Sequence, residues 1–141
     1  MSDASIQSIA DVEFGAELAT FTPDTSLDVV RPFAESVGWG GGRFDSHDKA
    51  RKEGLPGALV PGIMAMGFLT SMIHRWAPTA NVESIDTVFR APLIADDPCK
   101  VDAVVTDIDE DSGLVELDLT VKNERDETRV FGTAKVRIAK N

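Results

Sequence analysis

The stretch "VPGIMAMGFLTSMIHRWAP", residues 60–78, decides the fold. Its apolar residues lie on nearly all sides of a helix, which is typical of a helix buried by other elements. Pro61 suits the first turn of such a helix, where a missing backbone N–H costs nothing, and Pro78 ends the segment. The sequence therefore predicts one buried helix near the middle of the chain.

Four valine-rich segments follow this helix, and in each of them apolar residues alternate with polar ones, as in half-buried strands. They are "VESIDTVFRAPLI" (82–94), "CKVDAVVTDID" (99–109), "GLVELDLTVKNE" (113–124) and "TRVFGTAKVRIA" (128–139). "DEDSG" and "ERDE" between the last three are typical of hairpin turns. Three or four such strands in succession predict an antiparallel meander. One apolar helix before this sheet predicts an α+β fold with the sheet wrapped around the helix, the arrangement called a hot dog.

The N-terminal half is divided into short elements. We expect a flexible N-terminus over residues 1–10 and a single domain over 11–141. "VEFGAELATFTP" (12–23) predicts a short first strand. "TPDTSLDVVRPFAESVG" (22–38) predicts a short helix with Thr25 or Ser26 as its cap, Gly38 as its stop, and a start made uncertain by Pro32.

Three consecutive glycines, Gly40 to Gly42, exclude a regular helix in the next segment. "DSHDKARKEG" (45–54) then predicts a short polar helix, capped by Asp45 or Ser46 and ended by Gly54. The chain therefore enters the central helix through a loop and a short helix, which together carry a histidine and two aspartates.

Composition excludes several classes of protein. The 141 residues fit one domain, and the net charge of −10, from 24 acidic and 14 basic residues, disfavours nucleic-acid binding. Cys99 is the only cysteine, which excludes an intramolecular disulfide and a cysteine-based metal cluster; we expect a reduced, structural thiol. The N-terminus does not resemble a signal peptide, and "ALVPGIMAMGFL" is too short to span a bilayer. A cytoplasmic protein that binds no membrane is expected.

Four stretches resemble the MaoC-like dehydratase and R-specific enoyl-CoA hydratase family, which has the hot-dog fold. They are "FAESVG" (33–38), "ARKEGLPGALVPG" (50–62), "FRAPLIADDP" (89–98) and "VKNERDETRVFGTAKV" (121–136). The first resembles the start of the family motif FA-x-x-x-G-D-x-N-P-x-H, and the second a following A-x-x-x-G-x-x-G-x-x-x-H-G. The resemblance covers roughly residues 12–138.

The resemblance places two aromatic residues where the family carries its catalytic pair. Both motifs fit without a gap, so the aspartate of the first falls on Trp39 and its histidine on Phe44, while the histidine of the second falls on Pro61. The family is understood to add water across a trans-2-enoyl thioester, with the aspartate and histidine activating that water. A tryptophan can only donate a hydrogen bond and a phenylalanine has no polar atom, so neither can accept a proton. The ordinary hydratase mechanism is therefore expected to be absent.

Other residues are candidates for catalysis or binding, each with a plain structural alternative. His47, paired with Asp45 or Asp48, is the candidate for a displaced acid–base pair; otherwise it is a polar residue on a short exposed helix. The resemblance implies that the Gly62 N–H holds a thioester carbonyl; otherwise Gly62 lets helix and sheet approach closely. The remaining candidates for substrate binding are Trp39 with Phe44 as an aromatic plug, and Arg43 in the loop. Lys49, Arg51 and Lys52 form a cluster that could steer coenzyme A. Pro61 and Met64 are candidates at the start of the central helix.

Three functional hypotheses follow. In the first, the chain is a MaoC-like subunit that lacks the catalytic pair and supports an active relative in a heterodimer. In the second, it is an active hydratase or dehydratase that uses His47 and Asp45. In the third, it is a homodimer that binds an acyl ligand without catalysis. The first two imply an acyl thioester of coenzyme A or of an acyl carrier, the third an acyl or other small ligand, and no cofactor or metal is expected in any of them. A thioesterase is disfavoured, because relatives of that kind place a carboxylate on the central helix and residues 61–76 contain none.

Overall fold

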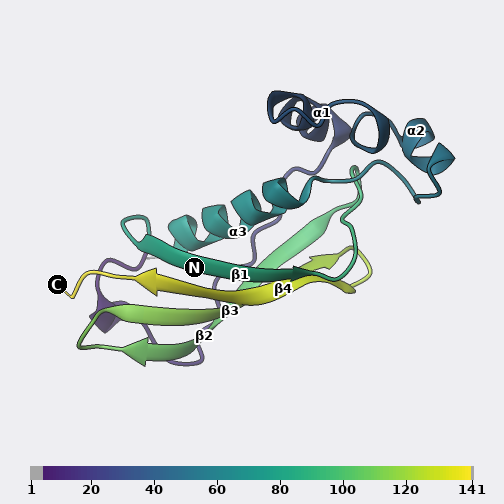
Figure 1. The fold of residues 1–141 in the computed structure, drawn as a ribbon. Helices are drawn as coiled ribbons and strands as arrows, with labels where there is room; N and C mark the ends of the chain where they lie inside the picture. The colour runs from purple at the N-terminus through teal and green to yellow at the C-terminus, as the bar shows by residue number, and fades with distance from the viewer. Residues whose placement is uncertain (1–4, 141) are drawn as a thin grey trace.

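The computed structural model describes residues 5–140, which form three helices and four strands in the order α1, α2, α3, β1, β2, β3, β4 (Figure 1). Two short 3-10 turns, Ile9–Asp11 and Gly42–Phe44, complete the regular elements. The bounds of the helices and strands are α1 Leu27–Ser36, α2 His47–Lys52, α3 Gly62–Trp76, β1 Asn81–Phe89, β2 Cys99–Asp109, β3 Leu114–Asn123 and β4 Thr128–Arg137.

The four strands form one antiparallel sheet with the order β1-β4-β3-β2. β2, β3 and β4 form the predicted meander. β1 does not continue it; it pairs with β4, from Asn81 opposite Arg137 to Phe89 opposite Val130. The reason is the connection between β1 and β2, residues 90–98. It is longer than a hairpin loop and carries the chain from one edge of the sheet to the opposite edge.

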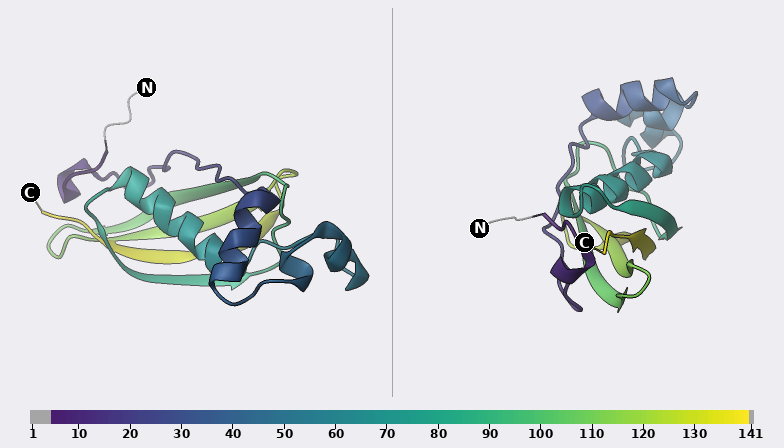
Figure 2. Two further views of the ribbon diagram at one scale, coloured as in Figure 1. Left: turned by 90° about the horizontal axis from the view of Figure 1, so that it is seen from above. Right: turned by 90° about the vertical axis from the view of Figure 1, so that its left-hand side faces the viewer.

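Helix α3 lies along one face of the sheet, as the views in Figure 2 show, and this confirms the predicted arrangement of a sheet around a helix. The helix is not buried all round, however. One side packs in the core through Met64, Ala65, Phe68, Leu69, Met72 and Ile73. The opposite side is open: Ile63 is 52% exposed, and Gly67, Ser71 and His74 are exposed as well. A single sheet covers one side of a helix only, which explains the difference.

Residues 5–10 contact the domain, and the flexible N-terminus over residues 1–10 stays a prediction. The Ile6 N–H donates to the carbonyl of Trp76 at 2.8 Å, and the Ile9 N–H donates to the carbonyl of Ala139 at 2.7 Å. Ile9 is buried in the core. An apolar side chain every third residue anchors this polar stretch. Residues 1–4 of the predicted flexible segment lie outside the described residues.

The predicted first strand, residues 12–23, runs beside β2 but does not form a continuous ladder with it. It makes two isolated bridges, Glu17 with Val104 and Phe21 with Val101. This segment covers the outer edge of β2. At the opposite edge of the sheet, β1 pairs with β4 alone among the described strands, so the second edge of β1 is open.

The two helices before α3 follow their predicted signals closely. Ser26 and Ser46 stand at the N-caps of α1 and α2, and the Ser46 Oγ accepts a hydrogen bond from the Lys49 N–H at 3.1 Å. Pro32 differs from expectation, since it lies inside α1 rather than in its first turn. A proline there removes one hydrogen bond and is tolerated in a short exposed helix. No helix between residues 5 and 140 is long and apolar enough to cross a membrane.

We expect Cys99 to be inert toward thiol reagents while the domain is folded. It is the first residue of β2, is 1% exposed, and burial raises the pKa of its thiol to about 11. Two units above the ordinary value lower the thiolate fraction at neutral pH by about 100-fold. Alkylation of native and urea-unfolded protein, followed by mass spectrometry, tests this. Equal rates in the two states would contradict the prediction.

Candidate functional site

A cavity of about 330 Å³ lies where the start of α3 meets the end of β1. We call it the α3 cavity. Its walls come from the 3-10 turn, the segment that enters α3, the start of α3, the end of β1, the connection after β1 and one residue of β4. They are mostly apolar, with Arg90 as the charged residue, and include Phe44, Leu59, Gly62, Phe89, Leu93 and Val130. The cavity therefore suits an apolar ligand with few polar atoms.

The first turn of α3 supplies a polar element of this cavity. Pro61 is buried at the N-cap, and its carbonyl accepts hydrogen bonds from the N–H groups of Met64 at 3.0 Å and Ala65 at 3.2 Å. The first amides of a helix have no partner within the helix and lie at the positive end of its dipole. Gly62 carries the first of them, so a ligand carbonyl beside it would meet a hydrogen-bond donor.

The packing interpretation of Gly62 concerns the Phe89 ring. A Cβ added at Gly62 would lie 3.4 Å from two carbons of this ring, which is ordinary van der Waals contact. The ring therefore lies against the start of α3 without requiring a glycine there. Both interpretations of Gly62, as an amide donor and as a point of close approach, stay predictions.

Trp39 and Phe44 stack on each other, with ring centroids 5.8 Å apart and an angle of 27° between the planes. Gly41 and Gly42, both with positive φ, turn the chain between them. Phe44 lines the α3 cavity, whereas Trp39 is 45% exposed. The pair has no group that accepts a proton, and only Phe44 reaches the cavity; the aromatic plug stays a prediction.

His47 and Asp45 each have other partners, so the structure does not bring them together. Asp45 bonds Lys49 Nζ at 2.5 Å and lies 3.3 Å from Arg31 Nε. The hydrogen bond from Lys49 is the main cause that lowers the pKa of Asp45. The displaced catalytic pair stays a prediction, and the activity assay described below tests it.

Both ring nitrogens of His47 are engaged. Nδ1 accepts a hydrogen bond from the Ala58 N–H at 3.0 Å, and Nε2 lies 2.8 Å from Asp96 Oδ2. Because a backbone N–H can only donate, Nδ1 is unprotonated, and the proton is on Nε2 and is donated to Asp96. A general base needs a free lone pair directed at the substrate, and His47 uses its lone pair on Ala58.

Asp96 is the residue of this region that sequence reasoning missed. It lies in the connection between β1 and β2 and has a φ of 68°, which is uncommon for a residue other than glycine. Its Oδ1 accepts a hydrogen bond from the N–H of Leu27, the first residue of α1, at 2.9 Å. No sequence spacing links Asp96 to His47 or to Leu27, and the only available signal is its place in the turn "ADDP".

Asp96 should contribute to stability in a pH-dependent way. Its pKa is lowered, first by the hydrogen bond from His47 and then by the N–H of Leu27. A lowered carboxyl pKa gives stability that is present above the ordinary value of about 4 and is lost as the pH falls through the folded value. We expect Asp96→Asn to flatten the acid side of the stability curve in urea unfolding. Asp48→Asn, at an exposed carboxylate, is the control; equal curves for wild type and Asp96→Asn would contradict the prediction.

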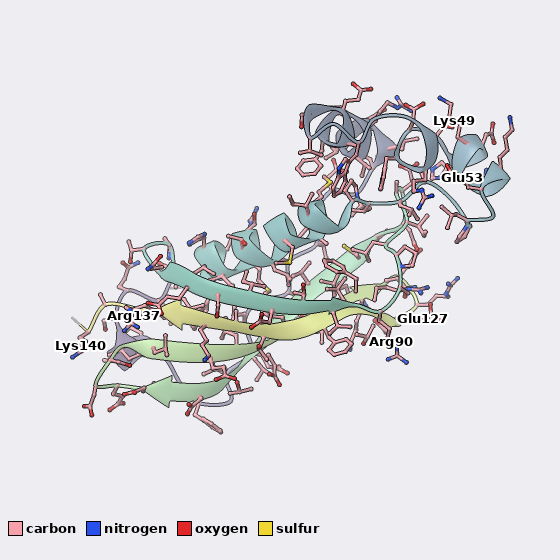
Figure 3. All side chains as sticks on the ribbon, in the orientation of Figure 1. Lys49, Glu53, Arg90, Glu127, Arg137 and Lys140 are labelled. Carbon is pink, nitrogen blue, oxygen red and sulfur yellow. The ribbon has the colours of Figure 1, made fainter. Side chains whose placement is uncertain are left out.

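The other candidates are occupied by contacts within the chain. Arg43 Nη2 bonds Glu53 Oε1 at 2.7 Å, and Arg51 Nη1 lies 3.6 Å from Asp48. Figure 3 shows Lys49 on α2 and Glu53 directly after it, at a distance from the strands. Met64 is buried in the core and is not among the described residues that line the α3 cavity. Lys49 and Arg51 of the basic cluster and Met64 therefore have structural partners.

In the comparison with known proteins, this chain matches solved structures. No family model matches the sequence, and no curated protein matches it. The R-hydratase PhaJ1 from Pseudomonas aeruginosa superimposes with a TM-score of 0.87 at 18% identity, over 95% of this chain and 86% of that one. A chain of the ChsH1–ChsH2 complex from Mycobacterium tuberculosis gives 0.80 at 20%, over 89% and 98%. An (R)-hydratase from A. caviae gives 0.84 at 16%, over 91% and 98%.

These matches establish the hot-dog fold, because they cover nearly the whole of both chains at high TM-scores. The structural neighbours are R-hydratases and MaoC-like dehydratases, the group that the sequence motifs resemble. At these identities the likeness concerns the fold, and the chemistry has to be argued from the residues of this chain.

Proposed function

We propose that this chain is a hot-dog subunit that binds an acyl thioester without transforming it, and that it pairs with a related chain that carries the catalytic aspartate and histidine. One observation carries the proposal: Trp39 and Phe44 stack beside the α3 cavity at the two positions where the family motif places acid–base groups. An apolar cavity beside two side chains that cannot accept a proton supports binding without catalysis.

The α3 cavity supports the binding part of the proposal. Its volume of about 330 Å³ falls at the lower end of the range of small-molecule pockets, ~300–1,000 Å³. Its apolar walls suit an acyl chain, and the amide of Gly62 suits a thioester carbonyl. Short acyl chains fit this volume better than long ones.

The open edge of β1 supports the pairing part. An unpaired strand edge on a folded protein is normally covered or blocked by charge. β1 ends in Val88 and Phe89, which are 52% and 50% exposed, and Phe131 of the neighbouring strand is also exposed. One of the structural neighbours, the ChsH1–ChsH2 complex, is itself an assembly of two chains.

Calorimetric titration with butyryl-CoA tests the binding part. We expect saturable binding, weakened about tenfold or more by Leu59→Trp, which places a large side chain in the cavity wall. Leu55→Trp is the matched control, because Leu55 lies in the preceding loop and does not line the cavity. Butyryl groups on coenzyme A and on a purified acyl carrier protein, compared side by side, distinguish the two carriers. No binding of either would refute the proposal.

Co-expression with a MaoC-like chain that has the intact motif, encoded by a neighbouring gene, tests the pairing part. We expect a stable complex of the two chains in gel filtration. A stable homodimer that ignores the second chain would favour the hypothesis of a ligand-binding homodimer.

A further inference from the structure

We propose that His47 and Asp96 form a latch that holds the wall of the α3 cavity in place, with both as positioning residues. The part that concerns ligand affinity rests on the proposed function; the part that concerns the wall does not. His47 stands at the start of α2 and Asp96 in the connection after β1, and together they join four segments of the chain.

The first contact joins α2 to the segment that enters α3. The Ala58 N–H donates to His47 Nδ1, and the imidazole is three-quarters buried. Gly57 is required at this point, because a Cβ there would lie 2.9 Å from Nδ1 and 3.0 Å from Ile94 Cγ2. Only a glycine leaves room for the ring to reach Ala58.

The second contact joins His47 to the start of α1 through one carboxylate. Asp96 Oδ2 accepts from His47 Nε2, and Oδ1 accepts from the Leu27 N–H at 2.9 Å. The Asp96 N–H donates to the carbonyl of Thr25, also at 2.9 Å. Aspartate tolerates the left-handed backbone at this position, although glycine would fit it with less strain. The backbone conformation alone would favour glycine at position 96, so the hydrogen bonds of the carboxylate are what an aspartate adds there.

The cavity wall begins directly beyond these two contacts. The carbonyl of Ala58 accepts from the Ala95 N–H at 2.8 Å, and the Val60 N–H donates to the carbonyl of Leu93 at 2.8 Å. Leu59, Val60 and Leu93 line the cavity. Two segments far apart in the sequence thus pair along the wall, and the latch closes their outer end.

The first test measures the latch without any ligand. The ¹⁵N shift of His47 in an NMR spectrum at neutral pH should show an unprotonated Nδ1. We expect His47→Ala to speed amide hydrogen exchange at Ala58 and Val60 by about tenfold or more, with exchange in β3 unchanged. Asp48→Ala, one residue along the same helix, should change neither signal. A protonated Nδ1, or unchanged exchange at Ala58 in His47→Ala, would overturn the proposal.

Two further variants separate the latch from general damage to the fold. Gly57→Ala keeps the imidazole but pushes it away from Ala58, so the Nδ1 shift should change. Asp96→Gly suits the backbone angle of that position and removes the carboxylate with its contacts to His47 and Leu27, so faster exchange at Ala58 together with a changed His47 ring shift reports the opened latch. If both variants kept the wild-type Nδ1 shift and exchange rates, the latch would be refuted even if His47→Ala failed to fold.

The second test uses butyryl-CoA. We expect Asp96→Gly to weaken its binding about tenfold while the exchange of β3 amides stays at the wild-type rate. If the wild type binds no butyryl-CoA, the proposed function fails, but the exchange result still decides the latch. If the wild type binds and Asp96→Gly binds equally well with faster exchange at Ala58, the latch does not control the cavity.

Discussion

The purified chain should hydrate crotonyl-CoA no faster than buffer does, and His47→Ala should leave that rate unchanged. Trp39 and Phe44 cannot exchange a proton with water, and the lone pair of His47 is held by the Ala58 N–H. Acid–base catalysis contributes about 100- to 10,000-fold in rate, so its absence is readily measured. Loss of the absorbance of the enoyl thioester follows the reaction.

The matching gain-of-function variant is Trp39→Asp combined with Phe44→His. It restores the acid–base pair at the positions that the family motif indicates, and we expect a rate increase within the same range of about 100- to 10,000-fold. Each single variant is a control that supplies only half of the pair. Robust activity of the wild-type chain that disappears in His47→Ala would contradict the proposed role and support the displaced-pair hypothesis.

The largest loss of stability should come from Gly132→Ala in β4. A Cβ at this position would lie 1.9 Å from the carbonyl oxygen of Asp86 and 2.9 Å from the Cα of Thr87. Both are backbone atoms of β1, so they cannot move without separating the two strands. Overpacking usually costs about 1–3 kcal/mol, and we expect a value at or above the upper end. Urea unfolding monitored by circular dichroism measures the free energy.

Gly67→Ala is the matched control for this substitution. Gly67 lies in the exposed side of α3, and a Cβ there would meet nothing within 4 Å. Alanine in a helix interior is favoured over glycine by about 0.5–1 kcal/mol, so this variant should be slightly stabilised. Equal stabilities of Gly67→Ala and Gly132→Ala would show that β1 and β4 do not approach each other as described.

Local signals account for the parts of the fold that the sequence predicts well. The caps at Ser26 and Ser46, the stop at Gly54 and the hairpins between β2, β3 and β4 each depend on a few neighbouring residues. The pairing of β1 with β4 depends on the path of residues 90–98, which no local pattern reveals. The open side of α3 was missed because the apolar pattern of a helix does not show how many elements will cover it.

The candidate site likewise has features that local sequence patterns predict and features that they do not. The two motifs place Trp39 and Phe44, and the structure stacks them. The partners of His47 could not be predicted, since Asp96 lies 49 residues away in the sequence and its carboxylate is positioned by a turn with a positive φ. A histidine beside two aspartates favoured a local pair, whereas the fold supplies a third aspartate from a distant loop.

The two outer edges of the sheet are unequal: residues 15–21 cover β2, while β1 is open. When two such sheets join edge to edge through β1, each uses the one open edge it has. A sheet joined in this way from two copies would end on both sides in a covered β2, with no edge left to recruit a third chain. In that arrangement the N-terminal segment would limit assembly through strand edges to pairs and would oppose open-ended β polymerisation.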